Sequence, residues 1–330
     1  MLKAGIIGCG AISPVHADAI KRLKNAHLAA VCDIDEKKAR EAAEKYGCKM
    51  YTDYKQIIEE VDAVHLCLPH YLHAPIAIEC LKAGKAVLTE KPMSIDYKDA
   101  CEMIKTSEET GKTLQVIFQN RLNDGSLLIR KCLDDGSLGS IKCARGIVTW
   151  KRRSDYYTCS NWKGRWATEG GGVVINQAIH TLDLMRWFVG GEIADVKAAM
   201  ANRKIPEIEV EDTAEGIITF ENGVEGLFYL TNGYGVDAPV QLELLCENGT
   251  AVITGCDAVI TYNDGRILRS DSCEENGIEG KSYWGNSHKR QIENFYNHLE
   301  KGEELLIPAA EALKTQKMIC MIYEKGRQTL

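Results

Sequence analysis

Several absences in this sequence exclude whole classes of protein. No apolar run approaches the about 20 residues that a membrane-spanning helix needs, so we expect no transmembrane segment. Lysine and arginine form no basic block, and the net charge is −7, which argues against nucleic acid and anionic membranes as main partners. No internal repeat or proline-rich linker divides the 330 residues. The chain can bury a sizeable core, and we expect two directly packed domains.

The cysteines also lack a pattern. The thirteen cysteines are odd in number and include no C-x-x-C pair, which predicts reduced and mostly buried thiols rather than a disulfide framework. A first strand is expected from residue 4, and no long apolar segment precedes it, so we expect no signal peptide. These features indicate a cytoplasmic protein.

The stretch from residue 3 to residue 33 carries the strongest functional signal. An apolar run leads into Gly8-Cys9-Gly10-Ala11-Ile12-Ser13, a helical pattern follows, and a second apolar run ends at Asp33. This is the order of a dinucleotide-binding βαβ unit, although Ser13 stands where a third glycine or an alanine is usual. Gly8 permits a tight turn, and Gly10, which has no Cβ, lets the backbone approach a pyrophosphate at the helix N-terminus.

The acid at the end of the second strand predicts the choice of cofactor. Asp33 can accept hydrogen bonds from both ribose hydroxyls and would repel a 2′-phosphate. We therefore expect NAD, with NADP the weaker ligand.

Strands and helices alternate through the first third of the chain. Short buried strands are expected at 63–68, 86–89 and 113–118, and helices at 36–46, 54–60, 72–82 and 97–110. This alternation predicts an α/β fold with a doubly wound parallel sheet and right-handed crossovers. We expect residues 1–119 to form an NAD-binding Rossmann domain and residues 120–330 to form a substrate-binding and oligomerisation domain.

The second part of the chain has a different pattern. Alternating strands are expected near 141–150, 193–200, 214–220, 224–230, 240–246, 251–254 and 258–262, with hairpin turns at 222–223, 248–249 and 264–265 and closing helices at 288–299 and 309–325. This pattern predicts an α/β domain with a large open, mostly antiparallel sheet. Its free face, on which we place Ile218, Leu227 and Leu244, should be covered in a homodimer or homotetramer.

An unusual segment separates the two patterns. Trp162, Lys163 and Trp166 precede three glycines, and a helix is expected from about 173 to 188. On that helix Asn176, His180 and Asp183 share one face, beside an apolar stripe formed by Ile175, Ile179, Leu182 and Met185. The polar row predicts the wall of a site, with a solvated face as the alternative. The two tryptophans and Lys163 could bind a polyol, or the tryptophans could be core residues.

These motifs resemble the Gfo/Idh/MocA oxidoreductase family, which includes glucose–fructose oxidoreductase and inositol dehydrogenase. The resemblance covers nearly the whole chain and is carried by GIIGCGAIS, VCDID, LPHYLHAPIAIECLKAGKAVLTEKP and GGGVVINQAIHTLDLMRW. It implies hydride transfer between nicotinamide and a hydroxyl carbon of a sugar, nucleotide sugar or cyclitol. It also implies that Lys91 of EKP is the acid/base and that His180 contacts the substrate hydroxyl.

The resemblance also implies the remaining site residues. The implied cofactor-binding residues are Gly8, Gly10, Ala11, Ile12, Asp33, Leu68, Pro69, His73, Glu90 and Lys91. The candidate substrate-binding residues, from the residue patterns and the resemblance together, are Lys91, Trp162, Lys163, Trp166, Asn176, His180 and His288. Two positions depart from the family pattern: Asn176 stands where many members have aspartate, and Pro69-His70 stands where Pro-Asn is common.

Several roles have alternatives. Asp183 either orients His180 or pairs with Arg186, and His288 either contacts substrate or only begins a helix. His70 and His73 have the spacing of metal ligands, but a catalytic zinc needs about three protein ligands, so we expect no metal. Two rival functions are a glycosidase that oxidises its substrate transiently with tightly held NAD, and a non-catalytic NAD(P)-binding redox sensor.

Overall fold

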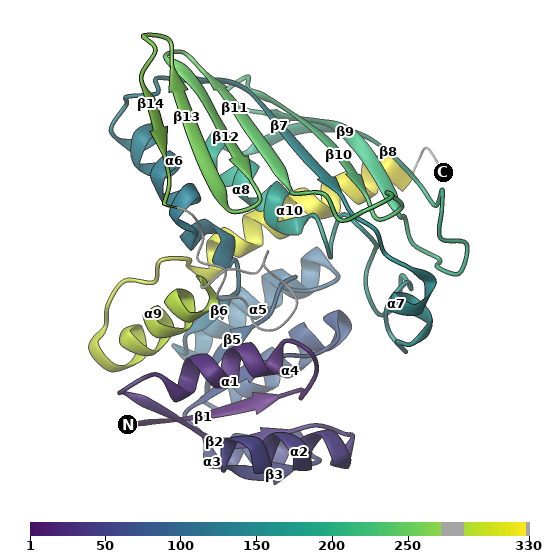
Figure 1. The fold of residues 1–330 in the computed structure, drawn as a ribbon. Helices are drawn as coiled ribbons and strands as arrows, with labels where there is room; N and C mark the ends of the chain where they lie inside the picture. Colours follow the sequence, from purple (N-terminus) through teal and green to yellow (C-terminus); the bar gives the residue numbers. More distant parts are fainter. Residues whose placement is uncertain (272–286, 328–330) are drawn as a thin grey trace. The chain divides into compact units, whose positions relative to one another are not determined.

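The computed structural model describes residues 1–271 and 287–327. The chain divides into two compact units, each assembled from separate segments (Figure 1). Unit 1 comprises Met1–Gln119 and Asn286–Leu313, and unit 2 comprises Asn120–Gly285 and Lys314–Leu330. Among the described helices, none combines the length and the apolar character needed to cross a bilayer.

Unit 1 is built on a six-stranded, wholly parallel sheet with the order β3-β2-β1-β4-β5-β6. Its strands are β1 (Leu2–Ile7), β2 (Ala26–Cys32), β3 (Lys49–Tyr51), β4 (Ala63–Leu66), β5 (Ala86–Thr89) and β6 (Leu114–Val116). The strand order reverses between β1 and β4, which are hydrogen-bonded neighbours. Such a switch point opens a crevice at the carboxyl ends of the strands, where open α/β sheets bind ligands. The predicted doubly wound sheet is confirmed.

The helices of unit 1 begin and end where local chemistry specifies. They are α1 (Ser13–Lys21), α2 (Glu36–Tyr46), α3 (Tyr54–Glu60), η1 (His70–Leu72), α4 (His73–Lys82), α5 (Tyr97–Thr110) and α9 (Ser287–Lys301). The carboxylates of Asp35, Asp53 and Asp96 accept backbone N–H groups at the starts of α2, α3 and α5. Gly47 and Gly111 end α2 and α5 in the left-handed conformation that favours glycine.

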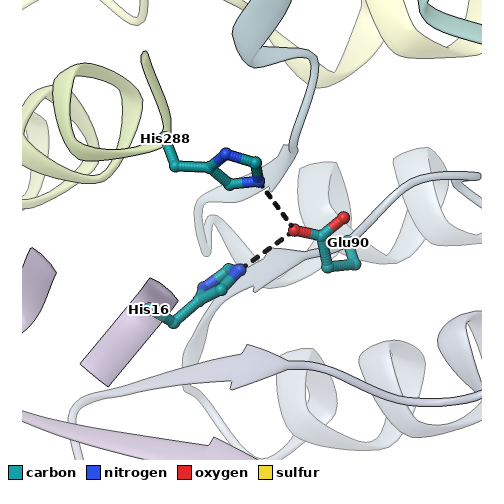
Figure 2. A group of neighbouring side chains, drawn as sticks. All are labelled: His16, Glu90 and His288. Carbon is teal, nitrogen blue, oxygen red and sulfur yellow. Dashed lines mark hydrogen bonds and ion pairs between the residues drawn. The ribbon is translucent and has the colours of Figure 1, made fainter. Parts of the chain in front are cut away.

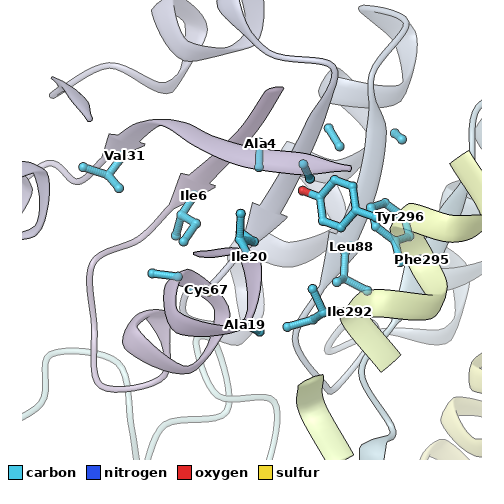
Figure 3. Close-up of a cluster of buried hydrophobic side chains, with 14 of the residues drawn as sticks. Ala4, Ile6, Ala19, Ile20, Val31, Cys67, Leu88, Ile292, Phe295 and Tyr296 are labelled. Carbon is cyan, nitrogen blue, oxygen red and sulfur yellow. The ribbon is translucent and has the colours of Figure 1, made fainter. Parts of the chain in front are cut away.

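The helix α9 completes the core of unit 1 although it is far away in the sequence. Its Ile292, Phe295 and Tyr296 are fully buried in one cluster with residues of the first sheet and α1 (Figure 3). Gln291 attaches α9 to the end of β6, because its Nε2 donates to the Val116 carbonyl and its Oε1 accepts the Phe118 N–H. Residues near 290 therefore belong structurally with the dinucleotide fold.

Unit 2 contains an eight-stranded sheet with the order β14-β13-β12-β11-β7-β10-β9-β8. Its strands are β7 (Ile141–Thr149), β8 (Ile193–Ala201), β9 (Thr213–Phe220), β10 (Glu225–Thr231), β11 (Gln241–Cys246), β12 (Gly249–Thr254), β13 (Asp257–Tyr262) and β14 (Ile267–Arg269). All pairs are antiparallel except β10 with β7. The predicted mostly antiparallel sheet is confirmed, and β14 is an additional short edge strand.

Four further helices follow the chain: α6 (Asp124–Asp134), α7 (Ser154–Thr158), α8 (Ile179–Val189) and α10 (Ala309–Gly326), and a 3-10 turn, η2 (Gln119–Leu122), precedes α6. The predicted helix from 173 to 188 was wrong at its start, because α8 begins only at Ile179. In the turns before α8, backbone N–H groups donate to side chains from other parts of unit 2. The Glu211 carboxylate accepts the N–H groups of Gly172 and Val174, and the Tyr323 hydroxyl accepts that of Ile175. The expected apolar stripe is nevertheless buried.

One face of the unit 2 sheet packs against α6 and α8, and the other carries exposed apolar side chains. The assignment of Ile218 and Leu244 to the free face was wrong, because both are fully buried. Leu227 does lie on the free face and is 49% exposed. Strand residues alternate between faces, so the free face includes the exposed apolar residues Leu227, Tyr229 and Leu245.

Most cysteines are thiols, as predicted. Eleven of the described cysteines are free; five of these are buried, five are half-buried, and Cys159 is exposed. Cys256 is disulfide-bonded, so the expectation of reduced thiols does not hold there.

Candidate functional site

The glycine loop of unit 1 has the geometry of a pyrophosphate cradle. Gly8 has a φ of +96°, and a Cβ there would lie 2.3 Å from the Cys67 carbonyl oxygen. Gly10 faces open space, since a Cβ built on it meets no atom within 4 Å. Ser13 closes the turn, because its hydroxyl donates to the Gly10 carbonyl over 2.8 Å. The loop therefore leaves room for an anion at the N-terminus of α1.

Asp33 is held against this loop at the end of β2. Its Oδ2 accepts the Cys9 N–H over 2.8 Å, and its Oδ1 accepts the Asp35 N–H over 2.9 Å. Burial and the nearby Asp33 charge raise the pKa of the Cys9 thiol to about 12, so this thiol stays protonated. The carboxylate is oriented by two amides and keeps lone pairs for ribose hydroxyls, which fits the adenosine half of NAD.

The loops after β4 and β5 meet at His73, which is fully buried. Its Nδ1 lies 2.6 Å from the Pro92 carbonyl and its Nε2 lies 2.9 Å from the Leu68 carbonyl. Burial lowers the pKa of His73, although both carbonyls oppose this shift. His73 thus connects the segment of Leu68 and Pro69 to the EKP segment, and its contact with cofactor stays a prediction.

Glu90 forms the centre of a buried cluster with His16 and His288, here called the Glu90 cluster (Figure 2). Its Oε1 lies 3.0 Å from His16 Nε2 and 3.2 Å from His288 Nε2. None of the three residues is more than 7% exposed. Burial opposes the ionisation of Glu90, but the hydrogen bonds to His16 and His288 hold its pKa well below the usual range.

The cluster continues through a second pair of side chains. His16 Nδ1 lies 2.8 Å from His65 Nδ1, and His65 Nε2 lies 2.8 Å from the Tyr296 hydroxyl. Burial lowers the pKa of His16 and lowers that of His65 further. Both rings are therefore neutral near pH 7.

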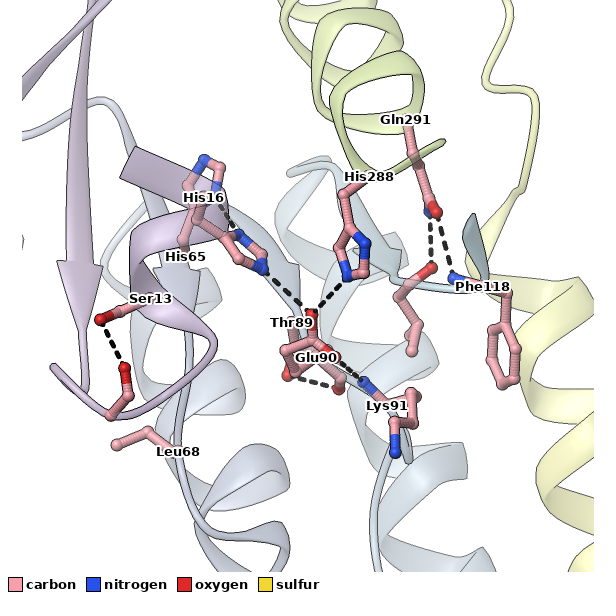
Figure 4. A network of polar contacts seen from close by, with 12 residues as sticks. Ser13, His16, His65, Leu68, Thr89, Glu90, Lys91, Phe118, His288 and Gln291 are labelled. Carbon is pink, nitrogen blue, oxygen red and sulfur yellow. Dashed lines mark hydrogen bonds and ion pairs between the residues drawn. The ribbon is translucent and has the colours of Figure 1, made fainter. Parts of the chain in front are cut away.

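Lys91 directly follows Glu90 at the carboxyl end of β5 (Figure 4). Its backbone N–H donates to Glu90 Oε2 over 3.3 Å, and its side chain is half-buried. The Lys91–Pro92 peptide bond is cis. The predicted acid/base thus stands at the edge of the sheet where ligands bind in this class of fold.

The candidate substrate residues of unit 2 lie at the start of α8. His180 is on the first turn of α8 and is half-buried. Asn176 lies in the turn before the helix, so the expected single helical face of Asn176, His180 and Asp183 is not formed. Asn176 instead donates to Glu169 Oε1 over 2.6 Å and to the Tyr156 hydroxyl over 3.4 Å.

Two buried carboxylates support this turn. The Glu169 carboxylate accepts hydrogen bonds from the Asn176 side-chain amide and the Gly164 N–H. The Glu211 carboxylate accepts hydrogen bonds from backbone N–H groups and from the Tyr323 hydroxyl. Burial raises the pKa of Glu169 and of Glu211 to about 7 each, against the lowering effect of these hydrogen bonds. The glycines permit this packing, since a Cβ at Gly172 would lie 1.8 Å from the Glu211 carbonyl oxygen.

Trp162, Lys163 and Trp166, the candidate substrate residues before the glycines, are half-buried. The Lys163 ammonium lies 3.6 Å from the ring centre of Tyr156 and 5.7 Å from that of Trp162. The Trp166 indole donates to the Glu209 carbonyl over 2.9 Å and packs edge-on against Tyr323. Trp166 therefore has a structural role, and its contact with substrate stays a prediction.

The main partner of Asp183 is Arg121, whereas the sequence predicted His180 or Arg186. Arg121 binds it in a bidentate ion pair at 2.8 and 2.7 Å, whereas Arg186 lies 4.0 Å away. The Thr315 hydroxyl also donates to Asp183 over 2.6 Å. The arginine and hydroxyl contacts lower the pKa of Asp183 despite its burial.

Sequence reasoning missed His16, His65 and Glu169. His16 is a polar residue at a buried position of α1, and His65 is one in the wholly buried strand β4. A histidine among otherwise apolar core positions is the only sequence signal for the network, because buried polar groups need partners. Glu169 carried no signal apart from its position before the three glycines.

Comparison with known proteins identifies the family of this chain. Residues 2–118 match the family described as "Oxidoreductase family, NAD-binding Rossmann fold", and residues 127–252 match the "GFO/IDH/MocA C-terminal domain". The myo-inositol 2-dehydrogenase of Thermotoga maritima is 25% identical, over 100% of this chain and 96% of its own length. The inositol 2-dehydrogenase of Rubrobacter xylanophilus is 30% identical, over 76% of this chain and 71% of its own length.

A solved structure has a sequence identity to this chain in the same range. The WlbA dehydrogenase from Bordetella pertussis, in complex with NADH and UDP-GlcNAcA, is 29% identical with a TM-score of 0.87. The match covers 100% of this chain and 97% of that chain. The glycine loop and Asp33 stay the predicted phosphate and ribose contacts for NAD. The chain therefore belongs to the Gfo/Idh/MocA family, and it is an NAD-dependent dehydrogenase acting on CH–OH groups.

Proposed function

We propose that the substrate is a secondary alcohol carbon of a sugar, nucleotide sugar or cyclitol, with Lys91 as the acid/base. The observation that carries this proposal is the position of Lys91, half-buried at the carboxyl end of β5 beside the β1–β4 switch point. The related dehydrogenases act on inositol or bind a nucleotide sugar, according to their names.

The chemistry assigns a role to each proposed residue. Bound NAD supplies the hydride acceptor. As the carbon loses hydride, its hydroxyl must lose a proton, and a base at that hydroxyl is needed. Lys91 Nζ is the proposed proton acceptor, and His180 is proposed to hydrogen-bond the same hydroxyl. Asn176 and His288 are weaker candidates for substrate contacts, because Asn176 is hydrogen-bonded to Glu169 and His288 is hydrogen-bonded to Glu90.

The segment before the glycines favours an anionic sugar over a neutral cyclitol. Lys151, Arg152, Arg153, Lys163 and Arg165 lie within fifteen residues and are interleaved with aromatic side chains. Arg152 is partly neutralised by Asp237 at 2.9 Å, and the exposed Arg153 lies 4.0 Å from Asp155. Positive charge beside aromatic rings suits the phosphates or carboxylate of a nucleotide sugar or uronate.

A substrate panel tests this proposal. The purified protein is incubated with NAD and with myo-inositol, aldoses, uronates or UDP-sugars, and NADH formation is followed by absorbance. We expect the highest kcat/KM with an anionic sugar. Oxidation of myo-inositol alone would restrict the substrate to cyclitols and remove the argument from the basic segment.

The same assay distinguishes the two rival functions. A glycosidase that oxidises only transiently would cleave a glycoside with no net NADH release. A redox sensor would bind NAD with no turnover, and substitution of Lys91 would not change its behaviour.

For assembly we propose a homodimer or homotetramer formed through the free face of the unit 2 sheet. Leu227, Tyr229 and Leu245 on that face are between 38% and 49% exposed. Large apolar side chains gathered on a flat sheet are typical of a surface that a second copy covers.

A further inference from the structure

The hydrogen bonds of the Glu90 cluster have a determined direction. An ionised carboxylate only accepts, so the Nε2 atoms of His16 and His288 both donate to Glu90. A neutral His16 then has a bare Nδ1, which accepts the Nδ1–H of His65. The Nε2 of His65 accepts the Tyr296 hydroxyl in turn. The chain of bonds is complete with neutral rings.

His288 fits the same assignment. Its Nδ1 is buried and, within residues 1–271 and 287–327, has no hydrogen-bond partner. A proton on that atom would be buried without an acceptor, which is costly. The five linked side chains therefore carry one net negative charge, on Glu90.

The topology of unit 1 places this charge at the carboxyl ends of the strands, where the cofactor crevice is expected. His16 is on α1, which follows β1, while Glu90 follows β5, on the far side of β4 from β1. The contact between His16 and Glu90 therefore crosses the carboxyl ends of the strands at the switch point. Asp33, on the β2 side, is the site for the adenosine ribose, so the nicotinamide end is expected on the β4–β5 side.

We propose that Glu90 is a fixed counter-charge for the nicotinamide ring, which makes the unit bind NAD⁺ in preference to NADH. The ring carries a positive charge when oxidised and none when reduced, so a nearby negative charge in a desolvated setting stabilises only the oxidised form. His16 and His288 are positioning residues that hold the carboxylate charged and oriented. The inference rests on the NAD site described above.

The test measures two dissociation constants by calorimetry, for NAD⁺ and for NADH. Lys91→Met is the background, because it removes the neighbouring ammonium at similar length. In this background Glu90→Gln should raise the ratio Kd(NAD⁺)/Kd(NADH) about tenfold, which corresponds to ~1.4 kcal/mol. A purely structural role for Glu90 would weaken both ligands and leave the ratio unchanged.

The control is Glu60→Gln, the same substitution at a half-buried carboxylate of unit 1 bonded to Lys49 and Tyr51. It should leave the ratio unchanged. If Glu90→Gln does not fold, His288→Leu carries the test: it removes one donor to the carboxylate, which disfavours the charged form of Glu90, so the ratio should rise by about threefold. A ratio that stays within twofold in the folded variant overturns the proposal. Binding of neither nucleotide by the unsubstituted protein would instead overturn the cofactor site.

The same three ligand atoms lie within 4.8 Å of one another, which is close enough to hold a metal ion. A metal ion binds an imidazole nitrogen that carries no proton, so the Nε2 atoms of His16 and His288 would have to be unprotonated. The hydrogen bonds from His16 through His65 to Tyr296 would then all have the opposite direction. Elemental analysis of the purified protein decides this point. Stoichiometric zinc that disappears in Glu90→Gln would overturn the counter-charge, whereas zinc-free protein is the expected result.

Discussion

The side-chain amide of Asn176 donates to the carboxylate of Glu169 over 2.6 Å in the interior of unit 2. Glu169 is fully buried, and burial raises its pKa from 4.5 to about 7. A carboxyl whose pKa is higher in the folded state stabilises the fold at low pH, and this contribution is lost as the pH rises from about 4.5 through about 7.

The first prediction follows from this shift. Glu169→Gln cannot ionise, so its melting temperature relative to the unsubstituted protein should rise between about pH 5 and about pH 8, by an amount reflecting roughly 2 kcal/mol. Calorimetric melts across this range give the comparison. A difference that does not change with pH would show that Glu169 keeps its ordinary pKa when folded. Glu221→Gln, at an exposed position between β9 and β10, is the control.

The second prediction concerns the choice between NAD and NADP. Asp33→Ser removes a carboxylate that repels a 2′-phosphate and accepts the ribose hydroxyls. NAD binding should weaken, and the ratio of kcat/KM for NAD to that for NADP should fall by about tenfold or more. Steady-state kinetics with both nucleotides measure this. A wild-type protein that used NADP tenfold better would show that the role of Asp33 is wrongly assigned.

The third prediction separates the roles of Lys91 and His180. Lys91→Ala should lower kcat by about 10²-fold or more, the usual effect of losing an acid/base, while the Kd for NAD⁺ changes much less. His180→Ala should raise KM and lower kcat more modestly. If Lys91→Ala kept near-normal turnover and His180→Ala abolished it, the two roles would have to be exchanged.

The fourth prediction concerns the ion pair between Arg121 and Asp183, in which both side chains are at most 3% exposed. Asp183→Asn removes the counter-charge of a buried guanidinium, which should lower the free energy of unfolding by about 3 kcal/mol. Chemical denaturation measures it. The matched control is Arg40→Gln in the exposed pair with Glu36, for which we expect less than about 1 kcal/mol. Equal effects at the two sites would contradict the prediction.

The fifth prediction concerns assembly. If the free face of the unit 2 sheet joins copies of the chain, then Leu227→Glu should convert an oligomer into monomers by placing charge in the interface. Light scattering at micromolar concentration gives the mass. Ile34→Glu, at a residue 92% exposed in unit 1, should leave the mass unchanged. A monomer mass for the unsubstituted protein would rule out this assembly.

Local patterns were enough to predict most elements of the fold. The glycine turn after the first strand, the alternation of buried strands and amphipathic helices, and the Asn-Gly and Asp-Gly turns each depend on residues close in the chain. Their periodicity and conformational preferences identify elements without any knowledge of distant contacts. For the same reason, spacing alone predicted a nucleotide site at Gly8, Gly10 and Asp33, whereas the role of Lys91 was predicted from the resemblance of the EKP motif to the family.

Only the tertiary structure decided which distant groups meet. The pairing of Glu90 with His16 and His288 joins positions separated by 74 and 198 residues, and no local pattern encodes such a contact. The late start of α8 has the same origin, because Glu211 and Tyr323 take backbone N–H groups that helical periodicity assigned to the helix. The face on which Ile218 lies also depends on which helices cover the sheet. Alternation specifies that two faces exist, whereas packing determines which face is buried.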